Sequence, residues 1–262
     1  MAIEPGLALG GLLGGFLVGL TGMGGGALLT PMLVFIFNVS PTAAVGSDLV
    51  ASLVMKPIGG AVHWRHRTVR TDIVSWLCLG SIPGAFVGVG LMHLMPASTA
   101  ENTIRVMLGI ALLATASTMI IRDQQSRRRD AGALDKPAAQ PVQVRRGATV
   151  LLGLIGGALV GFTSVGSGSL MIVVMSFLYP QLSKRELVGT DLVQAVPLVG
   201  AAAIGHLFLG DVAFGVTASL LVGALPGVFV GARLSSTGAT VIVRTAMPAV
   251  LVASGLKFLG AF

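Results

Sequence analysis

The feature that most constrains this chain is an internal duplication. The glycine-rich stretch 14–26 recurs at 156–168, and after one inserted residue the correspondence continues at a fixed offset of 143. Residues 46–50 (GSDLV) therefore match residues 189–193 (GTDLV). A duplicated hydrophobic unit is typical of secondary transporters. The sequence thus predicts two structural repeats within one chain.

The composition indicates the solvent in which these repeats fold. Hydrophobic residues make up 54% of the chain and charged residues only 10%, and the mean hydropathy is +0.91. Several apolar stretches reach the roughly 20 residues that a helix needs to cross a bilayer. No stretch shows the alternation of a membrane strand. We therefore expect an all-α polytopic membrane protein, whose clearest spans are 71–95, 101–121, 187–209, 213–234 and 241–260.

The positions of the charges predict a topology. Basic residues gather in the loop 63–70 and in the segment 122–146, and loops rich in Lys and Arg stay in the cytoplasm. The counterpart of the first loop, 206–212, carries only Asp211 as a charge and is expected outside. Under this topology every Lys and Arg except Lys56, Arg105 and Lys257 is cytoplasmic. The two repeats are therefore expected to be inverted, and the net charge of +7 indicates a cytoplasmic face near lipid, not nucleic-acid binding.

Each repeat begins with a pair of segments too short to span comfortably. These pairs are 6–21 with 27–37, and 147–163 with 169–179. Glycines separate the members of each pair, which predicts broken or re-entrant helices, followed in each repeat by three long transmembrane helices. We expect a first repeat at 1–121, a flexible basic cytoplasmic linker at 122–146, a second, inverted repeat at 147–262, and both termini in the periplasm.

The two glycine-rich breaks are the first candidates for a binding site. Free N–H groups at the ends of broken helices suit an anion, and glycine lets the main chain approach a ligand closely. The alternative is close helix packing through small residues, which we favour for Gly10, Gly14, Gly15 and Gly19. The candidate substrate-binding residues in the breaks are Gly22, Gly24, Gly25, Gly26, Ser164, Gly166, Ser167 and Gly168.

Lys56 is the sharpest single candidate. It lies within a span, where an ionisable side chain costs at least about 2.5–3.5 kcal/mol and usually faces a cavity and a partner. Its counterpart in the second repeat is Val199, so this cation occurs once per molecule. We expect Lys56 to be an anion ligand, and the alternative is a structural pair with Asp48.

Two symmetric pairs of titratable residues are candidates for proton coupling. Asp48 and Asp191 occupy equivalent positions, as do His63 and His206. The carboxylates could relay protons or could cap the N-termini of helices. The histidines could gate protons near neutral pH or could simply anchor the membrane interface.

Other kinds of chemistry have little support. The sequence contains no nucleophile–base arrangement, no cluster of metal ligands and no nucleotide-binding loop, and its single cysteine, Cys78, falls within a span. We therefore expect no enzyme, no cofactor and no metal site.

At these residues the sequence resembles the sulfite exporter TauE/SafE family, also called the 4-toluene sulfonate uptake permeases. The resemblance rests on the breaks 22–26 and 164–168, the two Gly-(Ser/Thr)-Asp-Leu motifs, and the Pro-Gly-xxx-Gly runs at 83–88 and 226–231. It covers nearly the whole chain apart from the linker. The resemblance implies transport of organosulfonates, sulfite or related sulfur oxyanions across the bacterial inner membrane.

The expected function is therefore a secondary transporter for a small sulfur-containing anion, coupled to protons. A passive anion channel and a carrier of a different small organic anion remain alternatives, as does a membrane scaffold whose partner contacts the linker. The expected partners are the anion, the lipid bilayer and protons. A small-residue face also permits a homodimer.

Overall fold

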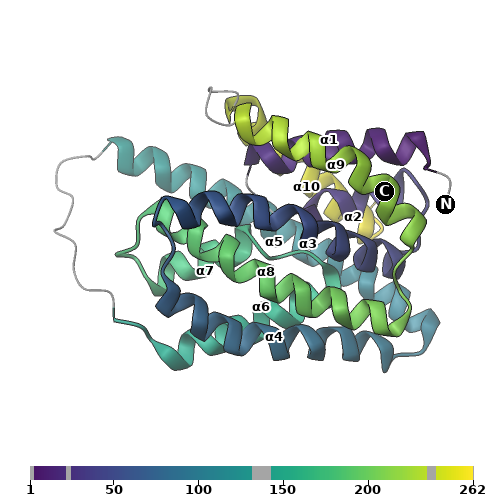
Figure 1. The fold of residues 1–262 in the computed structure, drawn as a ribbon, viewed down its shortest axis with the longest axis horizontal. Coiled ribbons are helices and arrows are strands. Elements are labelled where there is room, and N and C mark those ends of the chain that lie inside the picture. The colour runs from purple at the N-terminus through teal and green to yellow at the C-terminus, as the bar shows by residue number, and fades with distance from the viewer. Residues whose placement is uncertain (1–2, 22–24, 132–142, 235–239, 262) are drawn as a thin grey trace.

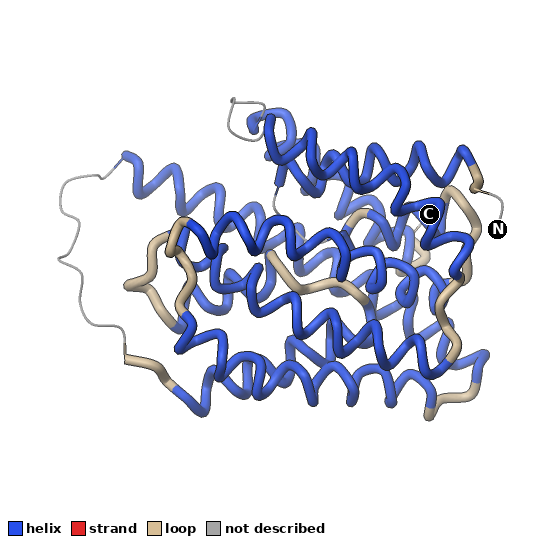
Figure 2. Tube along the Cα trace, viewed as in Figure 1, coloured by secondary structure: helices blue, strands red, loops and turns tan. Residues whose placement is uncertain are grey.

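The computed structural model describes residues 3–21, 25–131, 143–234 and 240–261, and within them the only regular elements are helices (Figure 2). In the first half these are α1 (Pro5–Thr21), the 3₁₀ turn η1 (Gly25–Ala27), α2 (Leu29–Phe35), α3 (Pro41–Arg65), α4 (Thr71–His93) and α5 (Ala97–Ala131). In the second half they are α6 (Arg146–Thr163), α7 (Ser169–Leu178), α8 (Lys184–Leu209), α9 (Phe214–Leu234) and α10 (Thr240–Phe258). The two short pairs at the starts of the halves are thus present within a few residues of their expected bounds.

Within the described residues, six helices are long and apolar enough to cross a membrane. They are α3, α4, α6, α9, residues 99–121 of α5 and residues 185–209 of α8. The chain is therefore a polytopic α-helical membrane protein, as the composition predicted. The sequence predicted that segment 147–163 is too short to cross a membrane comfortably. This prediction is wrong, because α6 has 18 residues and is long and apolar enough to span. In α10 the apolar segment Ala246–Phe258 is shorter than these six helices.

The helices of the two halves pack against one another in matched pairs. Helix α1 packs on α9 as its counterpart α6 packs on α4, and the central helices α3 and α8 contact each other, as do α5 and α10. In Figure 1, α3 and α8 lie side by side across the middle of the molecule. Equivalent helices of the two halves thus pack on equivalent helices of the other half, which agrees with a pseudo-two-fold axis between the halves. The inverted orientation of the halves in a bilayer stays a prediction.

Glycines bring the paired helices into backbone contact. A methyl group added at Gly15 in α1 would lie 2.4 Å from the carbonyl oxygen of Ala224 in α9, and one at Gly157 in α6 would lie 2.3 Å from that of Ser81 in α4. Gly19 packs in the same way as Gly15, whereas Gly10 and Gly14 face side chains of the α2 region. Small residues allow such close approach of helices in a membrane, so all four of these glycines lie in helix-packing contacts.

The linker differs in part from expectation. Helix α5 continues to Ala131, so residues 122–131 of the expected flexible segment are helical. Residues 132–142 lie outside the described part of the chain. The described end of α5 and the start of α6 lie at the left of Figure 1, whereas the N- and C-terminal markers lie toward the right.

Candidate functional site

The two glycine-rich breaks meet in the interior. A methyl group added at Gly26 would lie 2.1 Å from the carbonyl oxygen of Ser164 and 2.8 Å from its Oγ. Ser164 caps the C-terminus of α6 in the left-handed conformation (φ +60°), and Gly166 and Gly168 both have a φ of +119°. A side chain would strain the backbone at these two glycines. The sequence of the second break therefore ends α6 and turns the chain toward its contact with the first break.

Polar side chains from both halves converge on this contact. The Nζ of Lys56 in α3 donates to Oγ of Ser167 at 2.5 Å, and the hydroxyl of Ser164 donates to Oδ2 of Asp48. The ammonium of Lys56 also interacts electrostatically with Asp191 and Asp48. The two hydrogen bonds link α3 to the second break, and the interaction of Lys56 with Asp191 links α3 to α8.

The cluster is deeply buried. Asp48 is 0%, Asp191 1% and Lys56 7% exposed. Buried charges in membrane-spanning segments are costly and are kept where they pair or face a pathway. Two carboxylates and one ammonium would leave a net negative charge if all three were ionised. This cluster is consequently the candidate functional site.

One alternative for the two aspartates is wrong. Asp48 and Asp191 are not N-terminal caps, because α3 begins at Pro41 and α8 at Lys184. Instead, α8 starts with a capping box in which Ser183 and Glu186 exchange hydrogen bonds. Both carboxylates thus lie inside their helices, where the helix itself already satisfies the main-chain N–H groups.

The two symmetric histidines lie away from this cluster, near the C-termini of α3 and α8. The Nδ1 of His63 is 2.9 Å from Oγ1 of Thr68. The Nδ1 of His206 is 2.9 Å from Oδ2 of Asp211, and its Nε2 is 2.9 Å from the carbonyl oxygen of Gly161. Both histidines hold the loop that follows their own helix.

Each of these loops also contacts the central helix of the other half. The main-chain N–H of Arg70 donates to Oγ1 of Thr190 at 3.1 Å, and that of Ala213 donates to Oγ of Ser47 at 3.2 Å. Ser47 and Thr190 directly precede the two buried aspartates. The position of each aspartate is therefore connected to a loop of the opposite half.

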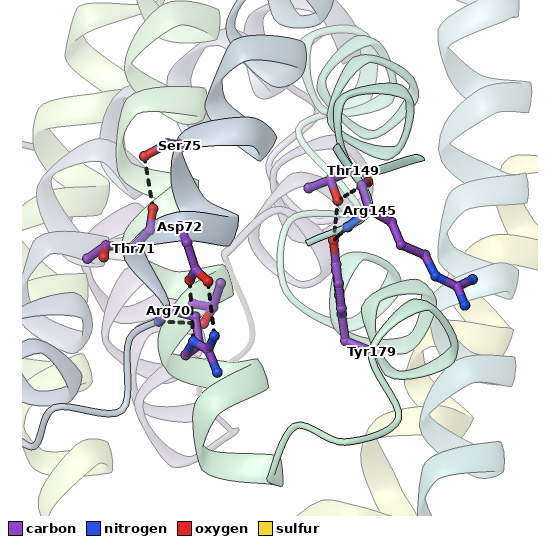
Figure 3. Close-up of polar contacts among 8 residues, drawn as sticks. Arg70, Thr71, Asp72, Ser75, Arg145, Thr149 and Tyr179 are labelled. Carbon is purple, nitrogen blue, oxygen red and sulfur yellow. Dashed lines mark hydrogen bonds and ion pairs between the residues drawn. The ribbon is translucent and has the colours of Figure 1, made fainter. Parts of the chain in front are cut away.

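Arg70, at the end of the 63–70 loop, and Arg145, at the start of α6, both take part in polar contacts (Figure 3). The guanidinium of Arg70 pairs with Asp72 at 2.9 Å, and this hydrogen bond raises the pKa of Arg70 above its ordinary value. On the neighbouring helices the hydroxyl of Tyr179 contacts Thr149 and accepts from the main-chain N–H of Arg145. These contacts fix the ends of α4, α6 and α7.

Several expected residues lie elsewhere or outside the described chain. Gly22 and Gly24 lie outside the described residues. A side chain at Gly166 would face Leu159, Val160 and Leu170 of the flanking helices. Gly25, by contrast, borders the cluster, since a methyl group there would lie 3.0 Å from Oδ1 of Asp48.

The sequence reasoning missed four polar side chains near these elements. Thr30 in α2 and Ser52 in α3 are buried close to Asp48, and Nε2 of Gln194 in α8 donates to Oγ of Ser81 in α4 at 2.7 Å. Ser52 follows Asp48 by four residues, and such spacing puts two side chains on one helix face. This four-residue spacing is the sequence signal that could have identified Ser52 as a neighbour of Asp48.

An apolar pocket of about 360 Å³ lies between α3, α4 and α8. Its lining includes Pro57, Trp64, Val193 and Pro197. Because carbon atoms line most of it, this pocket is not the polar cluster itself. Its lining residues Trp64 and Val74 lie at the ends of α3 and α4 that flank the 63–70 loop.

The described helices form a polytopic membrane protein whose two packed halves enclose a buried polar cluster. The sequence profile described as "Sulfite exporter TauE/SafE" matches residues 7–258, and the chain belongs to this family of membrane transporters. It is 38% identical over 258 residues to the "Probable membrane transporter protein YjnA" of Bacillus subtilis (strain 168), with 97% of this chain and 98% of that protein covered.

Two further relatives come from the same organism. The chain is 24% identical to the "Probable membrane transporter protein YdhB", covering 89% of this chain and 91% of that one. It is 23% identical to the "Probable membrane transporter protein YunE", covering 95% and 94% respectively. No solved structure matches the chain.

Proposed function

We propose that the protein is a secondary transporter, not an enzyme, that carries a small sulfur-containing anion across the bacterial inner membrane. Sulfite, thiosulfate and short organosulfonates are the candidate substrates. The description of the family as sulfite exporters supports this substrate class, and the probable transporters among its relatives support a transport function. We further propose that transport is coupled to protons.

The contact between Lys56 and Ser167 is the observation that carries this proposal. It joins the cation of the first half to the break of the second half, where the main chain of Gly26 meets Ser164. An oxyanion could exchange with these contacts, taking a charge-assisted hydrogen bond from the ammonium and further ones from hydroxyl or main-chain donors. The anion would then touch both halves at once.

The charge balance of the cluster supports proton coupling. An anion that entered beside Asp48, Asp191 and Lys56 would add a further negative charge to a buried site that holds two carboxylates and one ammonium. Burial of uncompensated charge is strongly unfavourable. Protonation of a carboxylate on binding would offset that cost and would link proton movement to anion movement.

The basic loops support an orientation. We place the 63–70 loop and the segment 122–146 in the cytoplasm and both termini outside, in line with the distribution of Lys and Arg. Rocking of one half against the other would expose the cluster to each side in turn. Each half also contributes a helix that packs against the opposite half, since α1 packs on α9 and α6 packs on α4.

Flux measurements in proteoliposomes test this function. Labelled sulfite, thiosulfate and a short sulfonate are offered with and without an imposed pH gradient. We expect saturable, gradient-sensitive uptake of at least one of them, with countertransport by unlabelled substrate. Linear, gradient-insensitive flux without countertransport would instead identify a passive channel. Absence of flux for all three anions would contradict the proposal that the substrate is a sulfur-containing anion.

Lys56→Ala provides the residue-level test. Loss of a hydrogen bond to a charged group costs about 1.5–3 kcal/mol, so we expect the apparent affinity for the anion to fall roughly 10- to 150-fold. Lys56→Arg should retain part of the activity because it keeps the charge. Lys257→Ala is the matched control, since Lys257 lies near the C-terminus over the ring of Phe35. Normal transport by Lys56→Ala would show that the lysine is not a ligand.

A further inference from the structure

Three buried oxygen atoms beside the first break have no hydrogen-bond partner among the described residues. They are Oγ1 of Thr30, Oδ1 of Asp48 and Oγ of Ser52, and the three residues are 0%, 0% and 2% exposed. Buried polar atoms are nearly always paired. Three orphan oxygens in one place therefore need an explanation.

Two of the three atoms border the same point, and the third lies near the same carboxylate. Asp48 and Ser52 lie on the same face of α3, because they are four residues apart. A methyl group added at Gly25 would lie 3.0 Å from both Oδ1 of Asp48 and Oγ of Ser52. The hydroxyl of Thr30 lies near the same carboxylate but outside hydrogen-bonding geometry. Carboxylate and hydroxyl oxygens thus lie together beside the main chain of η1.

This arrangement has no counterpart in the described part of the second half. At the offset of the repeat, Val173 and Ala195 occupy the positions of Thr30 and Ser52, while Asp191 matches Asp48. Val173 is 6% and Ala195 1% exposed, so the equivalent place in the second half is apolar and buried. The asymmetry points to a ligand that binds in the first half alone.

The ligand has the chemistry of a small, hard cation. Such ions take carboxylate, hydroxyl and carbonyl oxygens as ligands, and unwound main chain in broken transporter helices coordinates Na⁺. A proton on Oδ1 of Asp48 would need an acceptor in hydrogen-bonding geometry, and neither hydroxyl is so placed. A coordinated ion satisfies all three oxygens without direct contact between them.

We propose that Thr30, Asp48 and Ser52 bind one Na⁺ ion beside Gly25. One positive charge would neutralise the cluster of Asp48, Asp191 and Lys56, in which two carboxylates face one ammonium. Na⁺ would then be a coupling ion of the transporter, and proton exchange would fall to Asp191. The coupling role rests on the proposed function, whereas the binding of Na⁺ does not.

Binding is tested on the purified full-length protein without substrate. We expect saturable binding of about one ²²Na⁺ per chain, and a thermal midpoint that rises with NaCl but not with equal concentrations of KCl or choline chloride. The Thr30→Val/Ser52→Ala double variant approximates the second-half residues at these positions. It should weaken Na⁺ binding at least about 10-fold.

Thr115→Val is the matched control. The Oγ1 of Thr115 in α5 is also buried without a partner, so this change removes an equivalent hydroxyl away from the cluster and should leave Na⁺ binding intact. Equal responses to Na⁺, K⁺ and choline, or unchanged Na⁺ binding in the double variant, would overturn the site.

Flux separates this inference from the proposed function. Na⁺ binding together with sulfur-anion flux that stops in choline supports both the site and its coupling role. Na⁺ binding without flux of any sulfur anion supports the Na⁺ site and contradicts only the proposed sulfur-anion substrate. Flux that is unchanged in choline overturns Na⁺ as the coupling ion.

Discussion

A methyl group on Gly26 would lie 2.1 Å from the carbonyl oxygen of Ser164, so the main chains of the two glycine-rich breaks are in direct contact. Gly26 belongs to the turn η1 of the first half, and Ser164 caps α6 in the second half. The same Ser164 donates a hydrogen bond to Asp48. The contact therefore sets the position of the polar cluster as well as the spacing of the two halves.

Gly26→Ala should separate the two breaks. No flexible side chain can move away from the added methyl group, because the nearest atoms belong to the main chain. We expect a destabilisation of about 1–3 kcal/mol and loss of transport, measured as thermal midpoint in detergent and as flux. Gly90→Ala is the control, since nothing lies within 4 Å of the added group there. Wild-type stability and flux for Gly26→Ala would argue that the breaks are not in contact.

Gly157→Ala tests the packing of α6 on α4. The added methyl group would lie 2.3 Å from the carbonyl oxygen of Ser81, so the helices would have to move apart. We expect a loss of about 1–3 kcal/mol, measured by thermal unfolding in detergent. Gly147→Ala at the start of the same helix meets nothing within 4 Å and should not destabilise the protein. Equal midpoints for the two variants would exclude close backbone packing.

Replacement of residues 132–142 by Gly and Ser of equal length distinguishes a transporter from a scaffold. The described halves are held together by helix pairs that do not involve this segment. A flexible Gly/Ser chain still joins α5 to α6, so transport should remain close to the wild-type rate in proteoliposomes. A scaffold that binds its partner through the linker would lose that binding, and loss of transport would show that the segment has a further role.

The sequence by itself determined the membrane class and the element pattern. Apolar stretches of span length and glycine interruptions are local properties, so the short pairs α1–α2 and α6–α7 were located within a few residues. The same locality explains the errors. The Gly-Ser-Asp motif resembles a cap, yet Asp48 lies inside α3, because helix bounds depend on contacts that the motif does not contain.

Only the tertiary structure decided which polar groups meet. Lys56 and Ser167, or Asp48 and Ser164, come from different halves, and no local pattern specifies a partner across the repeat. Duplication identified the equivalent aspartates and histidines, but packing placed the aspartates in the buried cluster and the histidines at the ends of α3 and α8. The orphan oxygens of Thr30, Asp48 and Ser52 likewise became visible only once α2, η1 and α3 were packed, since burial is a property of the assembled helices.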